Sequence, residues 1–137
     1  MNIETRVYRL LNSDKTLIEL LSKLRQKNLE DDTGIWKHDI PENYRKQEFA
    51  PFIRISPVYE ADVEYSDDYS STEEQRVQLS FWCKTDTQAY EIKETIESIL
   101  KNNGLTRYTI NENPRYKDPD IDLLINHIKF RYFDWKI

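Results

Sequence analysis

Apolar residues in the first part of the chain recur at the spacing of one helical face. In the first such segment they are Ile3, Val7, Leu10 and Leu11. After Ser13 and Asp14, either of which can cap a helix, they are Leu17, Ile18, Leu20, Leu21 and Leu24. Residues 1–26 are therefore predicted to be helical, as a hairpin of two helices or as one kinked helix.

Further along the chain the apolar residues alternate with polar ones, which is typical of strands. Residues 52–59 alternate in this way, and Pro57 indicates a sheet edge or a bulge because proline has no amide hydrogen to donate. Residues 75–83 form the clearest strand. One of its faces carries Val77, Leu79, Phe81 and Cys83, and the opposite face carries Arg76, Gln78, Ser80 and Trp82.

A helical pattern returns after Thr85 and Asp86, either of which can cap it. Its apolar positions are Ala89, Ile92, Ile96, Ile99 and Leu100. Gly104 follows, where glycine commonly ends a helix. Beyond it, residues 106–110 are predicted to form a strand, residues 111–120 a turn-rich link, and residues 121–135 one long strand or hairpin.

Together these segments predict a single domain over residues 1–137. After the helical residues 1–26, residues 27–51 are interpreted as a long loop with one short strand, and residues 52–137 as sheet and helix. Strands that follow one another without a helix between them pair most readily as antiparallel neighbours. We therefore expect an α+β fold in which an antiparallel or mixed sheet of about four or five strands packs against the N-terminal helices and one central amphipathic helix.

An acidic, serine-rich stretch over residues 60–74 has little apolar surface to bury. We expect a mobile acidic loop here, as a hairpin tip or an extended arm. The candidates for contact with a partner are Asp67, Asp68, Tyr69, Glu73 and Glu74.

Composition and charge narrow the function. Aromatic residues supply enough bulk for a core, although 33% of the residues are charged. The net charge of -5 argues against a nucleic-acid-binding surface, which depends on clustered Lys and Arg. Cys83 is the single cysteine, so no internal disulfide can form, and we expect folding in the cytosol. The sequence has no run of about 18 apolar residues that could span a bilayer.

One catalytic lookalike is present, because Asp120 and the segment Asp134–Lys136 resemble the carboxylates and lysine of metal-dependent nucleases. If residues 121–133 form one strand, a rise of about 3.3 Å per residue separates the two aspartates by roughly 45 Å. They are then too far apart to share a metal ion.

The other reactive residue types give no stronger signal. His38 and His127 lie far apart in the sequence, and neither has a second metal-binding residue at the usual spacing. Cys83 ends an apolar strand face and is expected to be a buried thiol. With two glycines, the chain also has no phosphate-cradling loop. We therefore expect no enzyme, no metal site and no cofactor.

Large side chains that the strand pattern directs away from the expected core are the remaining feature: Trp82, Arg131, Phe133 and Trp135. Aromatic and Arg side chains are common anchors of protein interfaces. We interpret the set as a candidate subunit interface, with coverage by a further helix as the alternative.

Three stretches of the chain carry a resemblance to a known family: IPENYRKQEFAPFIRISPV (40–58), EEQRVQLSFWCKT (73–85) and RYKDPDIDLLINHIKFRYF (115–133). With the helices before and between them, they resemble the small tail-terminator or tail-completion (head-to-tail joining) proteins of siphophages and prophages of Gram-positive bacteria. The resemblance covers roughly Ile40 to Trp135 and rests on structural rather than chemical motifs.

This resemblance implies a structural protein of phage assembly. Such proteins form a ring, usually a hexamer, which caps the tail tube and joins tail to head. The expected partners are further copies of the chain, the tail-tube protein and the head connector or neck protein, with DNA only as passing cargo, no membrane and no cofactor. The expected locations are the host cytoplasm during assembly and the tail–head junction of the virion.

Three other functions stay open on the sequence alone. One is a neighbouring role in the phage neck, as a head-closure or connector protein. Another is a small acidic adaptor or immunity-type binding module, which would also have no catalytic residues. The third is the metal-dependent nuclease, which the expected strand geometry disfavours.

Overall fold

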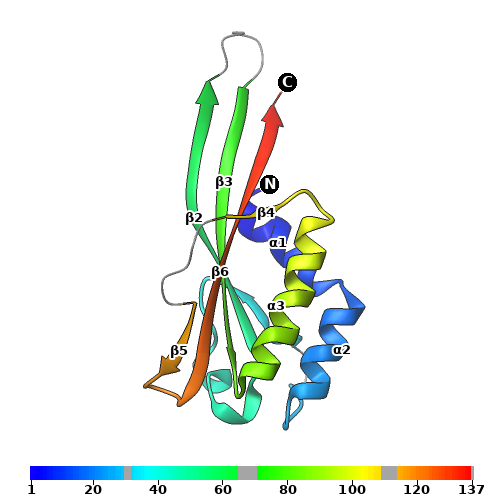
Figure 1. Cartoon of the computed structure of the whole chain (residues 1–137), viewed down its shortest axis with the longest axis vertical. Helices are drawn as coiled ribbons and strands as arrows, with labels where there is room; N and C mark the ends of the chain where they lie inside the picture. Colours follow the sequence, from blue (N-terminus) through cyan, green and yellow to red (C-terminus); the bar gives the residue numbers. More distant parts are fainter. Residues whose placement is uncertain (30–31, 65–70, 109–113, 137) are drawn as a thin grey trace.

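The computed structural model describes residues 1–29, 32–64, 71–108 and 114–136, with residues 64, 71, 135 and 136 described by their backbone alone. Helices and strands follow one another in the order shown in Figure 1. Their bounds are α1 Ile3–Asn12, α2 Lys15–Leu24, β1 Ile35–Lys37, η1 Glu42–Tyr44, η2 Gln47–Phe49, β2 Phe52–Glu64, β3 Ser71–Cys83, α3 Asp86–Lys101, β4 Thr106–Arg107, β5 Arg115–Asp118 and β6 Leu123–Lys136.

A mixed sheet of six strands forms the centre of the fold. Its order is β1-β2-β3-β6-β4, and β5 also pairs with β6. β1 runs parallel to β2, and the other pairs are antiparallel. The predicted α+β class is confirmed. The sheet has more strands than expected because β5 lies within residues 111–120, whose turn residues predicted a link without a strand.

Each face of the sheet has its own hydrophobic core. On the face covered by α1 and α3, against which α2 packs, the alternating residues of β3 pack as predicted, with Val77, Leu79 and Phe81 fully or almost fully buried. This face is here called the helix face. The opposite face, here called the outer face, has a smaller core beneath residues 38–51. In the loop predicted for residues 27–51, the short strand β1 joins the sheet, and residues 38–51 serve as a second covering layer.

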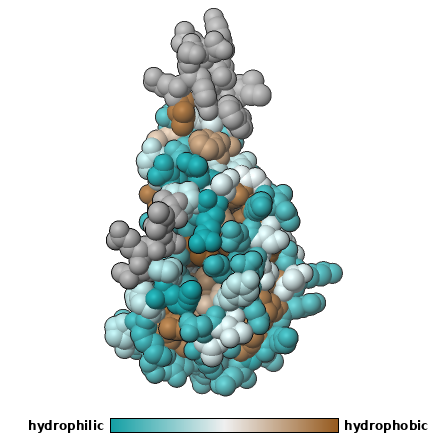
Figure 2. Space-filling view, in the orientation of Figure 1, coloured by the Kyte–Doolittle hydropathy of each residue, from teal (hydrophilic) through white to brown (hydrophobic). Residues whose placement is uncertain are grey.

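The longest strands extend beyond the helices. Residues 59–64 of β2, 71–76 of β3 and 131–136 of β6 pair in register and form a three-stranded projection, here called the arm (Figure 1). In Figure 2 the arm narrows away from the broader, mostly hydrophilic body. Both ends of the acidic loop predicted for residues 60–74 are strand instead, namely residues 60–64 of β2 and 71–74 of β3; residues 65–70 lie outside the described residues.

A β-bulge separates the two halves of β2. The register shifts between Pro57, which pairs with Val77, and Tyr59, which pairs with Arg76. The irregularity predicted at Pro57 is confirmed, since proline cannot donate to the ladder. The extra residue turns Tyr59 to the outer face and Glu60 to the helix face, opposite to their simple alternation from Phe52.

Arg25, just after α2, ties the covering loop to the helices. Its buried guanidinium donates from Nε to the Phe49 carbonyl oxygen at 3.0 Å and from Nη2 to the Pro51 carbonyl oxygen at 2.6 Å. Burial lowers the pKa of Arg25 to about 10. Gly34 lies against this guanidinium with a φ of +86°, and a Cβ atom there would collide with Nη2. Glycine is thus required both for its backbone angle and for the close approach of Arg25.

We predict that Gly34→Ala lowers the free energy of unfolding more than Gly104→Ala, measured by chemical denaturation. Both glycines have positive φ, so each substitution should cost about 1–2 kcal/mol in backbone strain. Gly34→Ala should cost about 1.5–3 kcal/mol more, because it displaces the charged donor Arg25 from its carbonyl partners. Equal losses in the two variants would contradict this account of Arg25.

Candidate assembly surface

Trp82 lies on the outer face of β3, as its strand position requires, but it is only 2% exposed. Phe52 packs against its ring at a centroid distance of 5.4 Å, and both belong to the core beneath residues 38–51. The expectation that Trp82 lies on the surface is therefore wrong. The cover is the loop before β2 rather than a further helix, and Trp82 is a core residue of the single chain.

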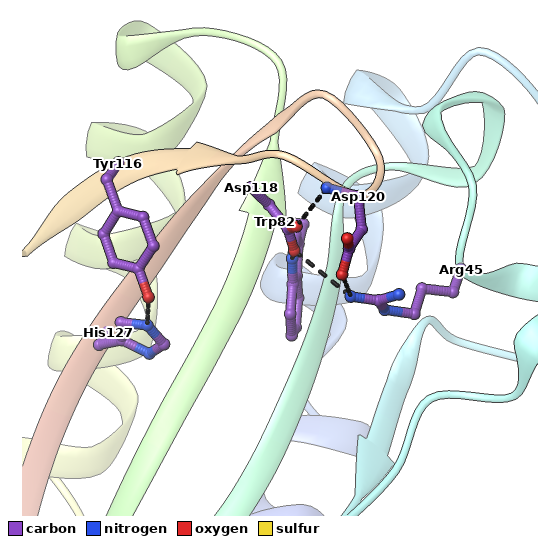
Figure 3. A network of polar contacts seen from close by, with 6 residues as sticks. All are labelled: Arg45, Trp82, Tyr116, Asp118, Asp120 and His127. Atoms are coloured by element: carbon purple, nitrogen blue, oxygen red, sulfur yellow. Dashed lines mark hydrogen bonds and ion pairs between the residues drawn. The ribbon is translucent and has the colours of Figure 1, made fainter.

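A polar network surrounds the buried Trp82 indole (Figure 3). Its Nε1 donates to a carboxylate oxygen of Asp118 at 2.9 Å, and the backbone N–H of Asp120 donates to the other oxygen at 3.0 Å. Arg45 lies 3.4 Å from Asp118 and 3.7 Å from Asp120. The network joins β3, the turn after β5 and the covering loop, so it is a structural junction.

The electrostatics of Asp118 agree with this structural role. Burial acts to raise its pKa, but the hydrogen bonds from Trp82 and Asp120 and the charges of Arg45 and Arg54 outweigh burial, so the pKa is lowered. A carboxylate held in this way stays ionised and accepts hydrogen bonds. No water or substrate is needed to satisfy it.

The nuclease lookalike does not assemble. β6 is one unbroken strand from Leu123 to Lys136, as predicted, so Asp120 precedes one end of it and Asp134 lies near the other. Asp120 is paired with Arg45 at the turn. Among the described residues, no three His, Cys, Asp or Glu side chains form a group that could hold a metal ion.

His127 forms a second polar group on the outer face. Its Nδ1 lies 2.9 Å from Ser80 Oγ and 3.2 Å from Gln78 Nε2. Its Nε2 lies 3.1 Å from the Tyr116 hydroxyl, as Figure 3 shows. Burial lowers the pKa of His127, and the charges of Arg54 and Lys129 lower it further. The Ser80–His127 contact resembles part of a hydrolase site, but Ser80 is 1% exposed and lies within a strand, so no substrate reaches its hydroxyl. His127 lies in β6, within the strand predicted for residues 121–135.

Cys83 is a free, buried cysteine, as predicted. Burial raises its pKa to about 11, although the Asn126 side chain 3.5 Å from its sulfur acts in the opposite direction. A thiol with this pKa is protonated at neutral pH and is a poor nucleophile.

Beyond the covering loop, the outer face of the arm carries an arginine–aromatic cluster made of Tyr59, Glu74, Arg76, Tyr108, Arg131 and Phe133. Glu74 is nearly buried and lies between the two arginines, 3.0 Å from Arg76 and 3.8 Å from Arg131. The Arg76 guanidinium lies over the Tyr59 and Tyr108 rings at 4.3 and 5.0 Å, and that of Arg131 lies 5.5 Å from the Phe133 ring centre. Contacts of this kind hold arginines flat against aromatic surface.

Two of the predicted interface residues belong to this cluster. Arg131 is partly exposed, and Phe133 is 37% exposed. Trp135 pairs with Thr72 through its backbone, and its side chain lies outside the described residues. The interface role of all three stays a prediction.

The predicted partner-loop residues separate. Glu74 lies on the outer face within the cluster, whereas Glu73 lies on the helix face, where it accepts a hydrogen bond from Gln75. Asp67, Asp68 and Tyr69 lie outside the described residues.

Sequence reasoning missed three members of the cluster: Tyr59, Arg76 and Tyr108. Arg76 was on the expected polar face of its strand and could have been included by alternation alone. Tyr59 could not, because the bulge at Pro57 reverses its face. Tyr108 follows the short strand β4, whose pairing with β6 carries no sequence signal.

Comparisons with known proteins identify the fold. No family model matches the sequence, and no curated protein matches it. Solved structures share the fold, among them the following two. A chain from the virion of a native gene transfer agent particle has a TM-score of 0.62 at 12% identity, over 98% of this chain and 96% of that one. The gp17 protein of bacteriophage SPP1 has a TM-score of 0.52 at 13% identity, over 97% of this chain and 86% of that one.

Among the described residues, none of the helices is both long and apolar enough to cross a membrane.

We predict that Trp82→Phe lowers the free energy of unfolding by about 2 kcal/mol, because it removes a hydrogen bond to a charged, buried carboxylate. Trp36→Phe is the matched control, since Trp36 is half-buried and stacks on Tyr44. Denaturation across pH gives a second test. A lowered carboxyl pKa stabilises the fold above its ordinary value of 3.8 and ceases to do so as the pH falls through the lowered value. The Trp82→Phe loss should therefore shrink in acid, and a constant loss would argue against the Asp118 contact.

His127 predicts a second pH effect. Because its pKa is lowered, the unfolded chain binds a proton more readily than the folded one as the pH falls below the ordinary histidine value of 6.5. The free energy of unfolding should fall over that range, and His127→Gln should flatten the fall. The same slope in the wild type and the His127→Gln variant would contradict the prediction.

Proposed function

We propose that this chain is a structural protein of a phage or phage-like particle, which caps the tail tube as a ring and joins tail to head. The observation that carries the proposal is a fold shared along nearly the whole of both chains with a component of a gene transfer agent virion. The same fold in the SPP1 gp17 protein supports it. An assembly role also agrees with the sequence resemblance to tail-terminator proteins.

The chemistry of the described residues supports assembly over catalysis. The polar groups that resemble parts of active sites are used for structure: Asp118 holds the Trp82 junction, and Cys83 is buried with a raised pKa. The accessible feature is instead the arm, with arginines and aromatic rings on its outer face. Such side chains are typical of protein interfaces.

A ring needs a heterologous contact, in which one patch of a subunit meets a different patch of the next and the rotation closes. We assign Arg131, Phe133 and Trp135 to one side of this contact. Asp67, Asp68 and Tyr69, between β2 and β3, are assigned to contact with the tail tube or connector, or to an acidic lumen past which DNA moves without binding.

Particles made without a functional copy of this chain should test the role directly. Electron micrographs should then show tails of uncontrolled length, or tails and filled heads that are not joined, and supplying the wild-type chain should restore normal particles. A head-closure or connector role would instead leave tails of normal length beside heads that have lost their DNA. Normal, infectious particles would contradict any role in the tail–head junction.

The interface assignment predicts that Phe133→Ser combined with Trp135→Ser weakens self-assembly at least tenfold, measured by analytical ultracentrifugation alone and with tail-tube protein. Removing a buried aromatic anchor commonly costs about 2 kcal/mol or more. Tyr90→Ser is the matched control, because Tyr90 is 63% exposed on α3, away from the arm. Unchanged assembly in the double variant would remove these residues from the interface, and a wild-type chain that stays monomeric even with tail-tube protein would favour an adaptor.

A further inference from the structure

The helix face of the arm is acidic. Its described carboxylates are Glu60, Asp62, Glu73 and Asp134. Asp62, Glu73 and Asp134 are direct cross-strand partners in one row of the sheet. Arg6 of α1 lies 4.6 Å from the Tyr132 ring, one row closer to the body, and marks where helical cover ends. Beyond that row, no described Lys or Arg side chain lies on this face.

The outer face of the same strands is basic. Its described basic side chains are Arg54, Arg76, Lys129 and Arg131, of which Arg76 and Arg131 belong to the arm, and the register places these two directly beside each other. Glu74 is the one described acidic side chain among them, and it is nearly buried between Arg76 and Arg131. The two faces of one three-stranded layer therefore carry opposite charge.

We propose that the acidic face of the arm in one copy packs against the basic, aromatic outer face of the arm in the next copy. This inference rests on the proposed ring and names both of its contact surfaces. Because the two patches are on opposite sides of one thin layer, each arm lies between two neighbours. The contact is heterologous, which is the kind that builds a ring.

Two features favour this contact. Asp62, Glu73 and Asp134 place three carboxylates side by side in one row of the sheet, and such a row is complementary in charge to a surface that carries Lys and Arg. On the other side of the contact, Tyr59 is 42% exposed and Phe133 is 37% exposed, and they offer apolar surface at the centre of the charged groups.

The size of the arm limits the strength of one contact. Six residues at about 3.3 Å and three strands at about 4.8 Å give a face of roughly 300 Å². Stable interfaces bury about 800 Å² on each partner, so one arm contact alone should be weak. Self-association is therefore expected to be salt-sensitive, and further contacts or the tail tube are expected to stabilise the closed ring.

Nucleic acid is a weaker occupant for the basic face. Phosphate binding depends on clustered cations that neutralise the backbone, and the opposite face of the thin arm adds four carboxylates that repel phosphate.

Two charge-reversal variants of the full chain test the contact. Asp62→Lys with Asp134→Lys changes the acidic face, and Lys129→Glu with Arg131→Glu changes the basic face while keeping the 3.0 Å ion pair of Arg76 with Glu74. Sedimentation equilibrium at high chain concentration and low salt should show wild-type self-association that weakens as salt is added. Each variant alone should associate at least tenfold more weakly, because like charges then face each other.

Mixing the two variants gives the decisive result. In an alternating assembly the new lysines meet the new glutamates, and the remaining contacts are those of the wild type, so an equimolar mixture should recover association. Recovery also shows that both variants are folded, because a misfolded chain cannot be rescued by its counterpart.

The proposal is overturned if the wild type does not associate at low salt, if either variant associates as the wild type does, or if the mixture gains nothing. It is also overturned if the Lys129→Glu, Arg131→Glu variant loses binding to a DNA oligonucleotide but keeps self-association. None of these results decides the tail–head role, which depends on the particles seen by microscopy.

Discussion

The difference in length between the strands and the helices shapes the whole molecule. β2, β3 and β6 have 13, 13 and 14 residues, which at about 3.3 Å per residue reach roughly 45 Å. α3, the longest helix, has 16 residues and spans about 24 Å. The helices can therefore cover only about half of one face. The remaining part, the arm, has no hydrophobic core of its own. It is held in place because its strands continue those of the body, and because ion pairs such as that of Arg76 with Glu74 link neighbouring side chains.

Within the arm, the bulge at Pro57 determines on which face of the sheet the charged side chains of β2 lie. Without the extra residue, Glu60 and Asp62 would lie on the outer face, among Arg76 and Arg131, and Tyr59 would lie with the acidic groups. The register shift places both carboxylates opposite Gln75 and Glu73 instead. One backbone irregularity thus converts a mixed surface into two faces of opposite charge, and the missing amide hydrogen of proline is its local cause.

Periodicity predicted the parts of this fold in which local pattern and tertiary burial agree. The alternation of Val77, Leu79 and Phe81, and the unbroken pattern that leads through Ile128 and Phe130, correspond to strands that bury one side.

Periodicity could not reveal β5, because Arg115, Tyr116 and Lys117 are exposed and are held there by pairing with β6. Nor could it place Trp82, whose cover comes from a loop that contributes single anchors such as Ile40 and Phe49.

The candidate surface was predictable only in part for a related reason. The net charge of -5 is a sum over the whole chain. It does not reveal a basic face, because acidic side chains elsewhere are more numerous than the basic ones on that face. Arg131 and Phe133 could be assigned to one face from strand alternation alone. Their relation to Arg76, Tyr59 and Tyr108 depends on which strands become neighbours and on a register shift of one residue. For the proposed assembly surface, that pairing is where the functional information lies, since charge segregation between two faces exists only once the strands are in register.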